Sequence, residues 1–154
     1  HKLPGRGDHR VTIDDFLSFL SEFDLPIPDE LRQVSDYVLV VEDEPLISKI
    51  IKLTLESADY SVITASSGFE AGALLHKHMP SVITLDLKIP GLDGISVLKF
   101  IRANKRFDEV KVLIISANIE EDDQVYFEIG ANGLLKKPFK NEVLIKKVNE
   151  LIGS

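Results

Sequence analysis

Five short apolar runs alternate with five amphipathic segments over most of this chain, and this alternation limits the possible fold more than any other feature of the sequence. The runs are rich in Val, Ile and Leu, and they lack the apolar–polar alternation of a half-exposed strand. They therefore indicate strands that are buried on both faces of a sheet. We expect these strands at residues 37–41, 62–65, 82–85, 112–115 and 133–135.

Apolar residues recur at the spacing of a helix face in the intervening segments. Ile47, Ile51 and Leu55 are one example, and the same spacing recurs within 71–75, 95–101 and 144–151. The segment 120–129 opens with four acidic residues, which suit the positive end of a helix dipole. Strands that alternate with helices predict a parallel sheet covered on both faces. Because such crossovers are right-handed, a doubly wound α/β sheet is the main candidate.

Length and composition exclude several classes of protein. The chain has 154 residues, no cysteine and a net charge of −7. The length suits one globular domain with a short additional segment, and the lack of cysteine excludes disulfides and thiolate metal sites. The negative charge argues against a nucleic-acid-binding surface over the whole chain. The apolar runs are too short for a membrane span, so we expect a cytoplasmic protein. The chain starts at His1 rather than Met, so we expect a fragment or a processed product.

Polar and charged residues directly follow four of the predicted strands. In an open parallel sheet, ligands bind beyond the carboxyl ends of the strands, so these residues are candidates for a shared site. They comprise three carboxylates, one hydroxyl and a Lys-Lys pair before a proline: Glu42, Asp43, Asp86, Ser116, Lys136, Lys137 and Pro138. Asp93, which lies further along the chain, is more simply the N-cap of the next helix.

Three carboxylates in one pocket repel one another. At about 4–5 Å and an effective dielectric near 20, each pair costs roughly 3–4 kcal/mol. A hard divalent cation with oxygen ligands relieves this repulsion, and Mg²⁺ suits a small cage that leaves positions open for a phosphoryl group. One carboxylate can then act as a nucleophile toward phosphorus, with Lys137 and Ser116 available to stabilise the transferred group.

Four segments, "VLVVEDEPL", "VITLDLKIPGLDG", "VLIISAN" and "GANGLLKKPF", occur in this order at the predicted strand ends. Together they resemble the response-regulator receiver domain of two-component signalling, over about residues 36–152. The resemblance implies a flavodoxin-like sheet of five parallel strands in the order 2-1-3-4-5. It also implies that residues 35–154 form the receiver domain and residues 1–34 a separate N-terminal helical segment.

The resemblance implies a Mg²⁺ site. Glu42 and Asp43 match the acidic pair that holds the metal in this family, although the family more often has Asp at the first position. Asp86 matches the phosphoacceptor aspartate, which is also a metal ligand. The backbone carbonyl of Lys88 is implied as a further ligand.

The resemblance also implies how the phosphoryl group is held. Ser116 matches the Ser or Thr that hydrogen-bonds it, and Lys137 matches the invariant lysine, whose peptide bond to Pro138 is often cis in this family. The switch position, usually Tyr or Phe, is Leu134 here, so the usual aromatic rotamer change is not available. Lys88 and Asn118 occupy positions where the family tunes hydrolysis of the aspartyl phosphate.

The implied function is phosphoryl transfer from a sensor histidine kinase or phosphotransfer protein to Asp86. The modification would change partner binding by the face formed by the fourth helix, fifth strand and fifth helix, which could also form a homodimer. The chain would not be an enzyme beyond catalysing its own phosphorylation and dephosphorylation. A stand-alone phosphorelay or scaffold receiver, or a non-phosphorylated binding module of the same fold, remains the alternative.

Two rival classes fit less well. A Mg²⁺-dependent phosphohydrolase would need a general acid two residues after its nucleophile, where this chain has Lys88, and a cap that covers the substrate. A flavin-mononucleotide module would need a phosphate-binding loop after the first strand, where "EDEPL" would repel phosphate. Taken singly, each site residue could also be a solvated charge or a turn former, and His76 and His78 are most simply solvated residues at a helix C-terminus.

The N-terminal segment has a different character. Residues 10–23 predict a helix with a wide apolar face, and Thr12 would be its N-cap. "GRGDHRVTIDDFLSFLSEFDLPIP" resembles the tail of an excisionase-like (MerR-like) winged helix-turn-helix unit, which would make the full protein a DNA-binding transcriptional regulator. The other interpretation is a helix that packs on the main domain. Four basic and seven acidic residues in 1–34 make DNA binding possible only through a missing unit.

Overall fold

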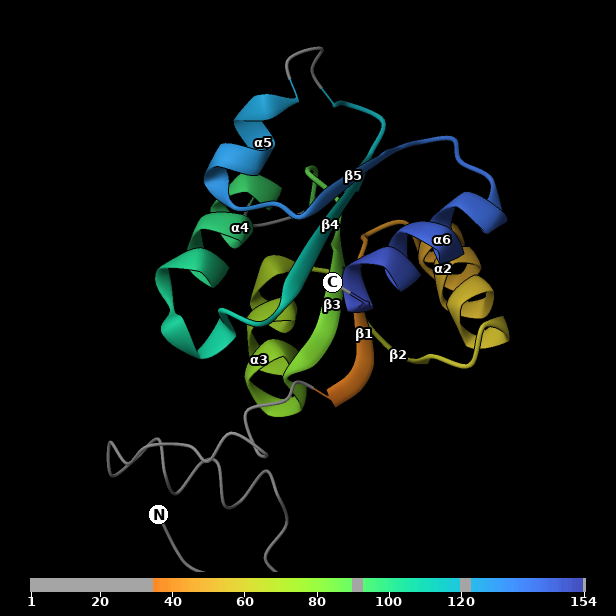
Figure 1. Ribbon diagram of the computed structural model, residues 1–154, viewed down its shortest axis with the longest axis horizontal. Coiled ribbons are helices and arrows are strands. Elements are labelled where there is room, and N and C mark those ends of the chain that lie inside the picture. The colour runs from red at the N-terminus through yellow and green to blue at the C-terminus, as the bar shows by residue number, and fades with distance from the viewer. Residues whose placement is uncertain (1–34, 90–92, 120–122, 154) are drawn as a thin grey trace, which may run out of the picture. The chain divides into compact units, whose positions relative to one another are not determined.

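The computed structural model describes residues 35–89, 93–119 and 123–153. They form a five-stranded sheet with the order β2-β1-β3-β4-β5, in which every neighbouring pair is parallel (Figure 1). The strands are β1 Ser35–Val41, β2 Ser61–Ala65, β3 Pro80–Leu85, β4 Lys111–Ser116 and β5 Gly133–Lys136. The predicted doubly wound sheet and its strand order are confirmed.

Helices cover both faces of this sheet. In Figure 1, α3, α4 and α5 lie on one side of the strands, and α2 and α6 lie on the other. The helices are α2 Pro45–Ser57, α3 Gly68–His78, α4 Gly94–Ala103, the 3₁₀ turn η2 Lys105–Phe107, α5 Gln124–Ile129 and α6 Asn141–Ile152. Helix α3 begins where Ser67 Oγ accepts the N–H of Glu70, and α4 begins where Asp93 Oδ1 accepts the N–H of Ser96, as predicted for Asp93.

The side chains of β1 show how the two layers form. Val38 and Val40 are buried in the cluster that also contains α2 and α6 residues, whereas Leu39 and Val41 are buried in the cluster beneath α3 and α4. Successive strand residues point to opposite faces, so an uninterrupted apolar strand supplies both cores. The continuous apolar pattern of the sequence therefore reflects a strand covered on two sides.

Two expectations need correction. Strands β2 and β5 are partly exposed rather than buried on both faces, because each lies at an edge of the sheet. Helix α5 begins at Gln124, later than the predicted 120–129, and Asp123 makes no side-chain cap. His76 is exposed, as expected at the end of a helix, and its ring centroid also lies 4.9 Å from that of Phe107. The predicted N-terminal helix and its cap Thr12 lie outside the described residues.

The start of α4 lies against the backbone that follows β3. A Cβ atom placed on Gly94 would lie 2.4 Å from the carbonyl oxygen of Asp86, and the Gly94 N–H donates to the Leu87 carbonyl at 2.9 Å. By contrast, a Cβ on Gly72 in α3 would have no atom within 4 Å. Only the first of these two glycines is required by close packing.

Gly94→Ala should therefore lower the free energy of unfolding by about 1–3 kcal/mol, because the backbone after β3 must move to admit the methyl group. The matched variant Gly72→Ala should raise it by about 0.5–1 kcal/mol, because alanine favours a helix and meets open space. Urea unfolding followed by circular dichroism measures both. A stabilising Gly94→Ala would contradict the packing described for α4.

Candidate functional site

The carboxyl ends of β1 and β3 bring three carboxylates together. Val41 pairs with Leu85 in the parallel register, so the residues after these strands, Glu42 and Asp86, are neighbours. The Asp86 N–H donates to the Val41 carbonyl at 3.1 Å and continues the ladder by one residue. With Asp43, these carboxylates offer oxygen atoms that all lie within 4.8 Å of one another. The acidic cluster predicted from the sequence is present.

Lys137 reaches this cluster from the end of β5. Ser116 pairs with Lys136 in the register of β4 and β5, and the Lys137 N–H donates to the Ser116 carbonyl at 3.1 Å. The Lys137 ammonium donates to Asp86 Oδ2 at 3.2 Å and also to Glu42 Oε1. The peptide bond between Lys137 and Pro138 is cis, as the resemblance implied. Lys137, and not Lys136, is therefore the cation of the site.

Charge in the site is unbalanced. Glu42 is 3% exposed and Asp86 is 8% exposed, whereas Asp43 is exposed. Burial raises the pKa of Glu42 to about 7, the hydrogen bond from Lys137 opposes this rise, and Asp86 adds to it. Burial tends to lower the pKa of Lys137, but its hydrogen bonds and attraction to Glu42 and then Asp86 raise it. One ammonium among three carboxylates leaves the cluster suited to a further cation.

Ser116 completes the set of side chains at the strand ends. It is fully buried at the end of β4, and its Oγ accepts the N–H of Asn118 at 3.2 Å. A buried hydroxyl held by the following loop has a restricted orientation, unlike a solvated serine. The structure thus places Ser116 at the same edge of the sheet as the acidic cluster.

Backbone groups also hold the site, and these were not predicted from the sequence. The Lys88 N–H donates to Asp86 Oδ1 at 3.1 Å, and the Glu44 N–H donates to Glu42 Oε2 at 3.3 Å. The Lys88 side chain is exposed. Its backbone carbonyl as a metal ligand stays a prediction. An aspartate side chain commonly accepts the N–H of the residue two positions further on, so Asp86 itself was the signal for the bond from Lys88.

This arrangement defines a class of protein: a doubly wound α/β domain with an acidic, lysine-containing site at the carboxyl edge of its sheet. Residues 38–149 match the family model of the response regulator receiver domain, and the chain belongs to this family. The family match does not extend to residues 1–34, so it gives no support to the resemblance of that segment to a helix-turn-helix unit.

Curated relatives are regulators of transcription. The chain is 34% identical to the "DNA-binding dual master transcriptional regulator RpaA" of Synechocystis sp., over 75% of this chain and 48% of that protein. It is 37% identical to the "Alkaline phosphatase synthesis transcriptional regulatory protein PhoP" of Bacillus subtilis, over 75% of this chain and 48% of that protein. The chain therefore spans about half the length of these relatives.

Solved structures agree with the family. A putative response regulator from Chloroflexus aurantiacus superimposes with a TM-score of 0.73 and 29% identity, over 77% of this chain and 98% of that one. The receiver domain of the sensor histidine kinase PA1611 of Pseudomonas aeruginosa, with a magnesium ion in its active site cleft, gives a TM-score of 0.71 and 30% identity, over 79% of this chain and 100% of that one. In the described part of the chain, no helix is both long and apolar enough to cross a membrane.

We expect a hard divalent cation to stabilise the fold through the acidic cluster. At a Mg²⁺ concentration about ten times its dissociation constant, the free energy of unfolding should rise by about 1.4 kcal/mol, because the cation binds only the folded chain. Asp43→Asn should abolish most of this gain, whereas Glu150→Gln, which removes an exposed acid on α6, should retain it. Thermal unfolding with and without Mg²⁺ measures the effect. Equal stabilisation of both variants would exclude the cluster as the site.

Proposed function

We propose that this chain is a phosphoacceptor receiver domain that takes a phosphoryl group onto Asp86 in the presence of Mg²⁺. The observation that carries this proposal is the geometry of Asp86. Its carboxylate lies within reach of two further acids, one oxygen accepts the Lys88 N–H, and the other accepts the Lys137 ammonium. An aspartate used only for structure needs no such set of charged neighbours.

The transfer is a displacement at phosphorus. One carboxylate oxygen of Asp86 attacks the phosphorus of a phosphohistidine, and a P–O bond forms as the P–N bond breaks. The imidazole nitrogen leaves with the electron pair and takes up a proton from solvent. In dephosphorylation, water attacks the same phosphorus, which releases inorganic phosphate and restores the carboxylate. The chain thus catalyses only its own modification and its reversal.

The donor set fits Mg²⁺. Glu42, Asp43 and Asp86 supply hard carboxylate oxygens from separate backbone positions, and the exposed Asp43 leaves one side of the cluster open to solvent. The carbonyl of Lys88 would add a further oxygen ligand. When bound, Mg²⁺ supplies positive charge beside the transferring phosphoryl oxygens.

Lys137 and Ser116 act on the phosphoryl group itself. The ammonium already donates to Asp86, so it lies beside any group attached to that carboxylate. The Ser116 hydroxyl supplies a neutral donor from the neighbouring strand end. Fixed donors near developing negative charge stabilise the transition state without the cost of reorienting solvent.

Helix α2 offers a surface for the phosphoryl donor. It begins just after Asp43, and Leu46, Ile50 and Leu53 share one face, with exposed fractions of 69%, 39% and 55%. An apolar stripe beside an acidic site suits a helical donor domain that must bring its phosphohistidine to Asp86. We propose a sensor histidine kinase or a phosphotransfer protein as this partner, acting in the cytoplasm, where ATP for kinases is available.

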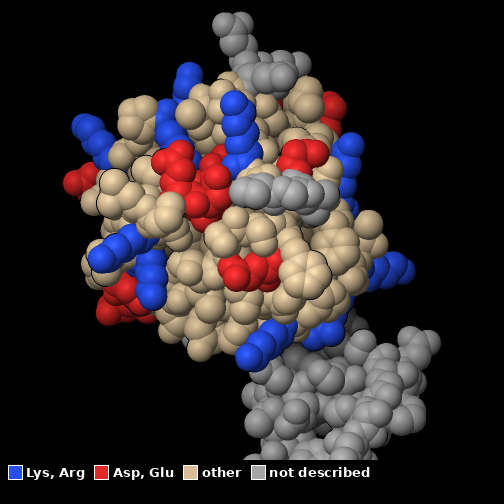
Figure 2. All heavy atoms as spheres, turned by 180° about the vertical axis from the view of Figure 1, so that it is seen from behind, with Lys and Arg blue, Asp and Glu red and all other residues tan. Residues whose placement is uncertain are grey.

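The names of the relatives support a proposal that the output is regulation of transcription. Residues 35–154 would be the receiver domain, and the face of α5, β5 and α6 would change its partner affinity or form a homodimer on phosphorylation. On the face seen in Figure 2, acidic and basic side chains are interspersed rather than gathered into a basic stripe. Because residues 1–34 carry seven acidic against four basic residues, any DNA contact would be made through a further unit rather than by that segment.

Incubation with acetyl phosphate and Mg²⁺ should add one phosphoryl group, seen as a single increment in the intact mass. Asp86→Asn and chelation by EDTA should each abolish the increment. Asp93→Asn, which removes an exposed acid close in sequence, should leave it unchanged. If the wild-type chain binds Mg²⁺ but gains no mass, the alternative holds: a binding module of the same fold without phosphorylation.

Ser116→Ala should slow this phosphorylation by about tenfold or more, because the transition state loses one positioned donor. Ser116→Thr keeps the hydroxyl and should retain most of the rate. The initial rates of mass gain under the same conditions measure both. Unchanged kinetics in the alanine variant would remove Ser116 from the proposed mechanism.

A further inference from the structure

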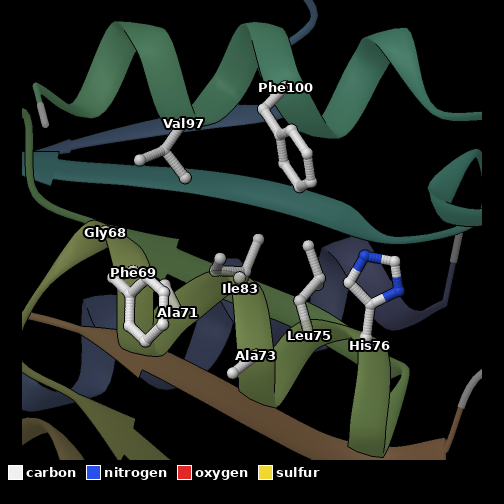
Figure 3. Close-up of a pocket in the computed structure, with 10 residues that line it drawn as sticks. Gly68, Phe69, Ala71, Ala73, Leu75, His76, Ile83, Val97 and Phe100 are labelled. Carbon is white, nitrogen blue, oxygen red and sulfur yellow. The ribbon is translucent and has the colours of Figure 1, made fainter.

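A groove between α3 and α4 has no role in phosphoryl transfer. It encloses about 340 Å³ and is lined by ten residues. In Figure 3, Val97 and Phe100 project from α4 toward the opening, Leu75 and His76 project from α3, and Ile83 of β3 lies between the two helices. The groove is a separate candidate binding site on the face opposite α2 and α6.

Small residues on α3 create this space. Ala71, Gly72 and Ala73 line the groove in succession, and a Cβ on Gly72 would meet no atom within 4 Å. In a closely packed interior, neighbouring helices would fill such a space with side chains. Here, the space remains open although the surrounding residues Leu75 and Ile83 are among the most buried of the chain.

The walls of the groove are aromatic and uncharged. Phe69 is 90% exposed and Phe100 is 45% exposed, so both rings present apolar surface to solvent. None of the ten lining residues is Asp, Glu, Lys or Arg. Burial, and then the charge of Arg106, lower the pKa of His76, so its imidazole is neutral at neutral pH. A charged ligand would lose its hydration here without gaining a partner.

We propose that this groove binds a small, uncharged, planar aromatic compound, with its ring between the α3 and α4 walls and one hydrogen-bonding group toward His76. The volume lies at the lower end of the range for small-molecule sites, so a compound of one or two rings fits. Its binding would cover the exposed rings of Phe69 and Phe100, and aromatic contacts add to the gain from burial.

A protein partner suits this groove less well. Among the described residues of α3 and α4, only Phe69 and Phe100 are large exposed apolar side chains. A stable interface between proteins needs about 800 Å² on each partner. Two side chains do not provide such a surface, whereas a compound of one or two rings needs much less area.

The test uses indole as the probe, the whole chain labelled with ¹⁵N, and no Mg²⁺ or phosphoryl donor. Saturable changes in amide chemical shift should be confined to α3, α4 and Ile83, with a dissociation constant on the order of 1 mM. Gly72→Leu should weaken binding by at least tenfold, because the new side chain occupies the open space. Lys146→Leu, which adds an exposed leucine to α6, should bind indole like the wild type.

Three results would overturn the proposal. Indole could give no saturable shifts, or its shifts could persist in a folded Gly72→Leu variant, or they could spread equally to the exposed leucines of α2. A fourth result would come from sedimentation equilibrium without indole. If the wild-type chain is a dimer and the Gly72→Leu variant is a monomer, the groove is an interface between two copies of the chain. Because neither Mg²⁺ nor phosphorylation enters the test, its outcome is independent of the function proposed for Asp86.

Discussion

Repulsion among Glu42, Asp43 and Asp86 is the constraint on which the site depends. At separations below 4.8 Å, the ionised groups would cost several kcal/mol, which the ammonium of Lys137 and the backbone N–H groups of Lys88 and Glu44 offset in part. Burial raises the pKa of Glu42 to about 7, and the neighbouring carboxylate of Asp86 adds to this rise. Apolar side chains at the two buried positions, Glu42 and Asp86, would avoid the cost of burying charge. The retained repulsion is energetic support for a site that accepts Mg²⁺ and a phosphoryl group.

The parallel sheet makes this crowding possible. Strands β1 and β3 are neighbours in space but not in sequence, and their register brings Glu42 beside Asp86. The charged end of β5 is two strands away from β3, and the long side chain of Lys137 spans that distance over β4. The strand order, more than any local conformation, therefore determines which residues meet.

The fold and the side chains of the site could be predicted because their signals are local. A continuous apolar run marks a buried strand, and the residues that directly follow it must lie at the sheet edge. The packing of Gly94 could not be predicted, since it depends on how the backbone returns over the strand end. The groove between α3 and α4 could not be predicted for a similar reason. The apolar pattern of α3 does not show how far this helix lies from α4. Strand β2 is partly exposed because it lies at an edge of the sheet. The residues of β2 alone do not reveal its position in the strand order.

Leu134 lacks the aromatic ring that the resemblance to receiver domains implies at its position. Leu134 is only partly buried and packs against the core cluster beneath α3, α4 and α5. Because it is a leucine, it has no ring that could move between two positions. The C-terminal end of α5 is held by Arg102, which donates to the carbonyl of Gly130 at 2.9 Å and to Asn132 Oδ1 at 2.8 Å. A Cβ on Gly130 would collide with Arg102, so this attachment is closely packed. Because Ser116 ends the strand that leads to α5 and lies at the edge with Asp86, we propose Ser116 rather than Leu134 as the residue through which a change at Asp86 reaches the output face.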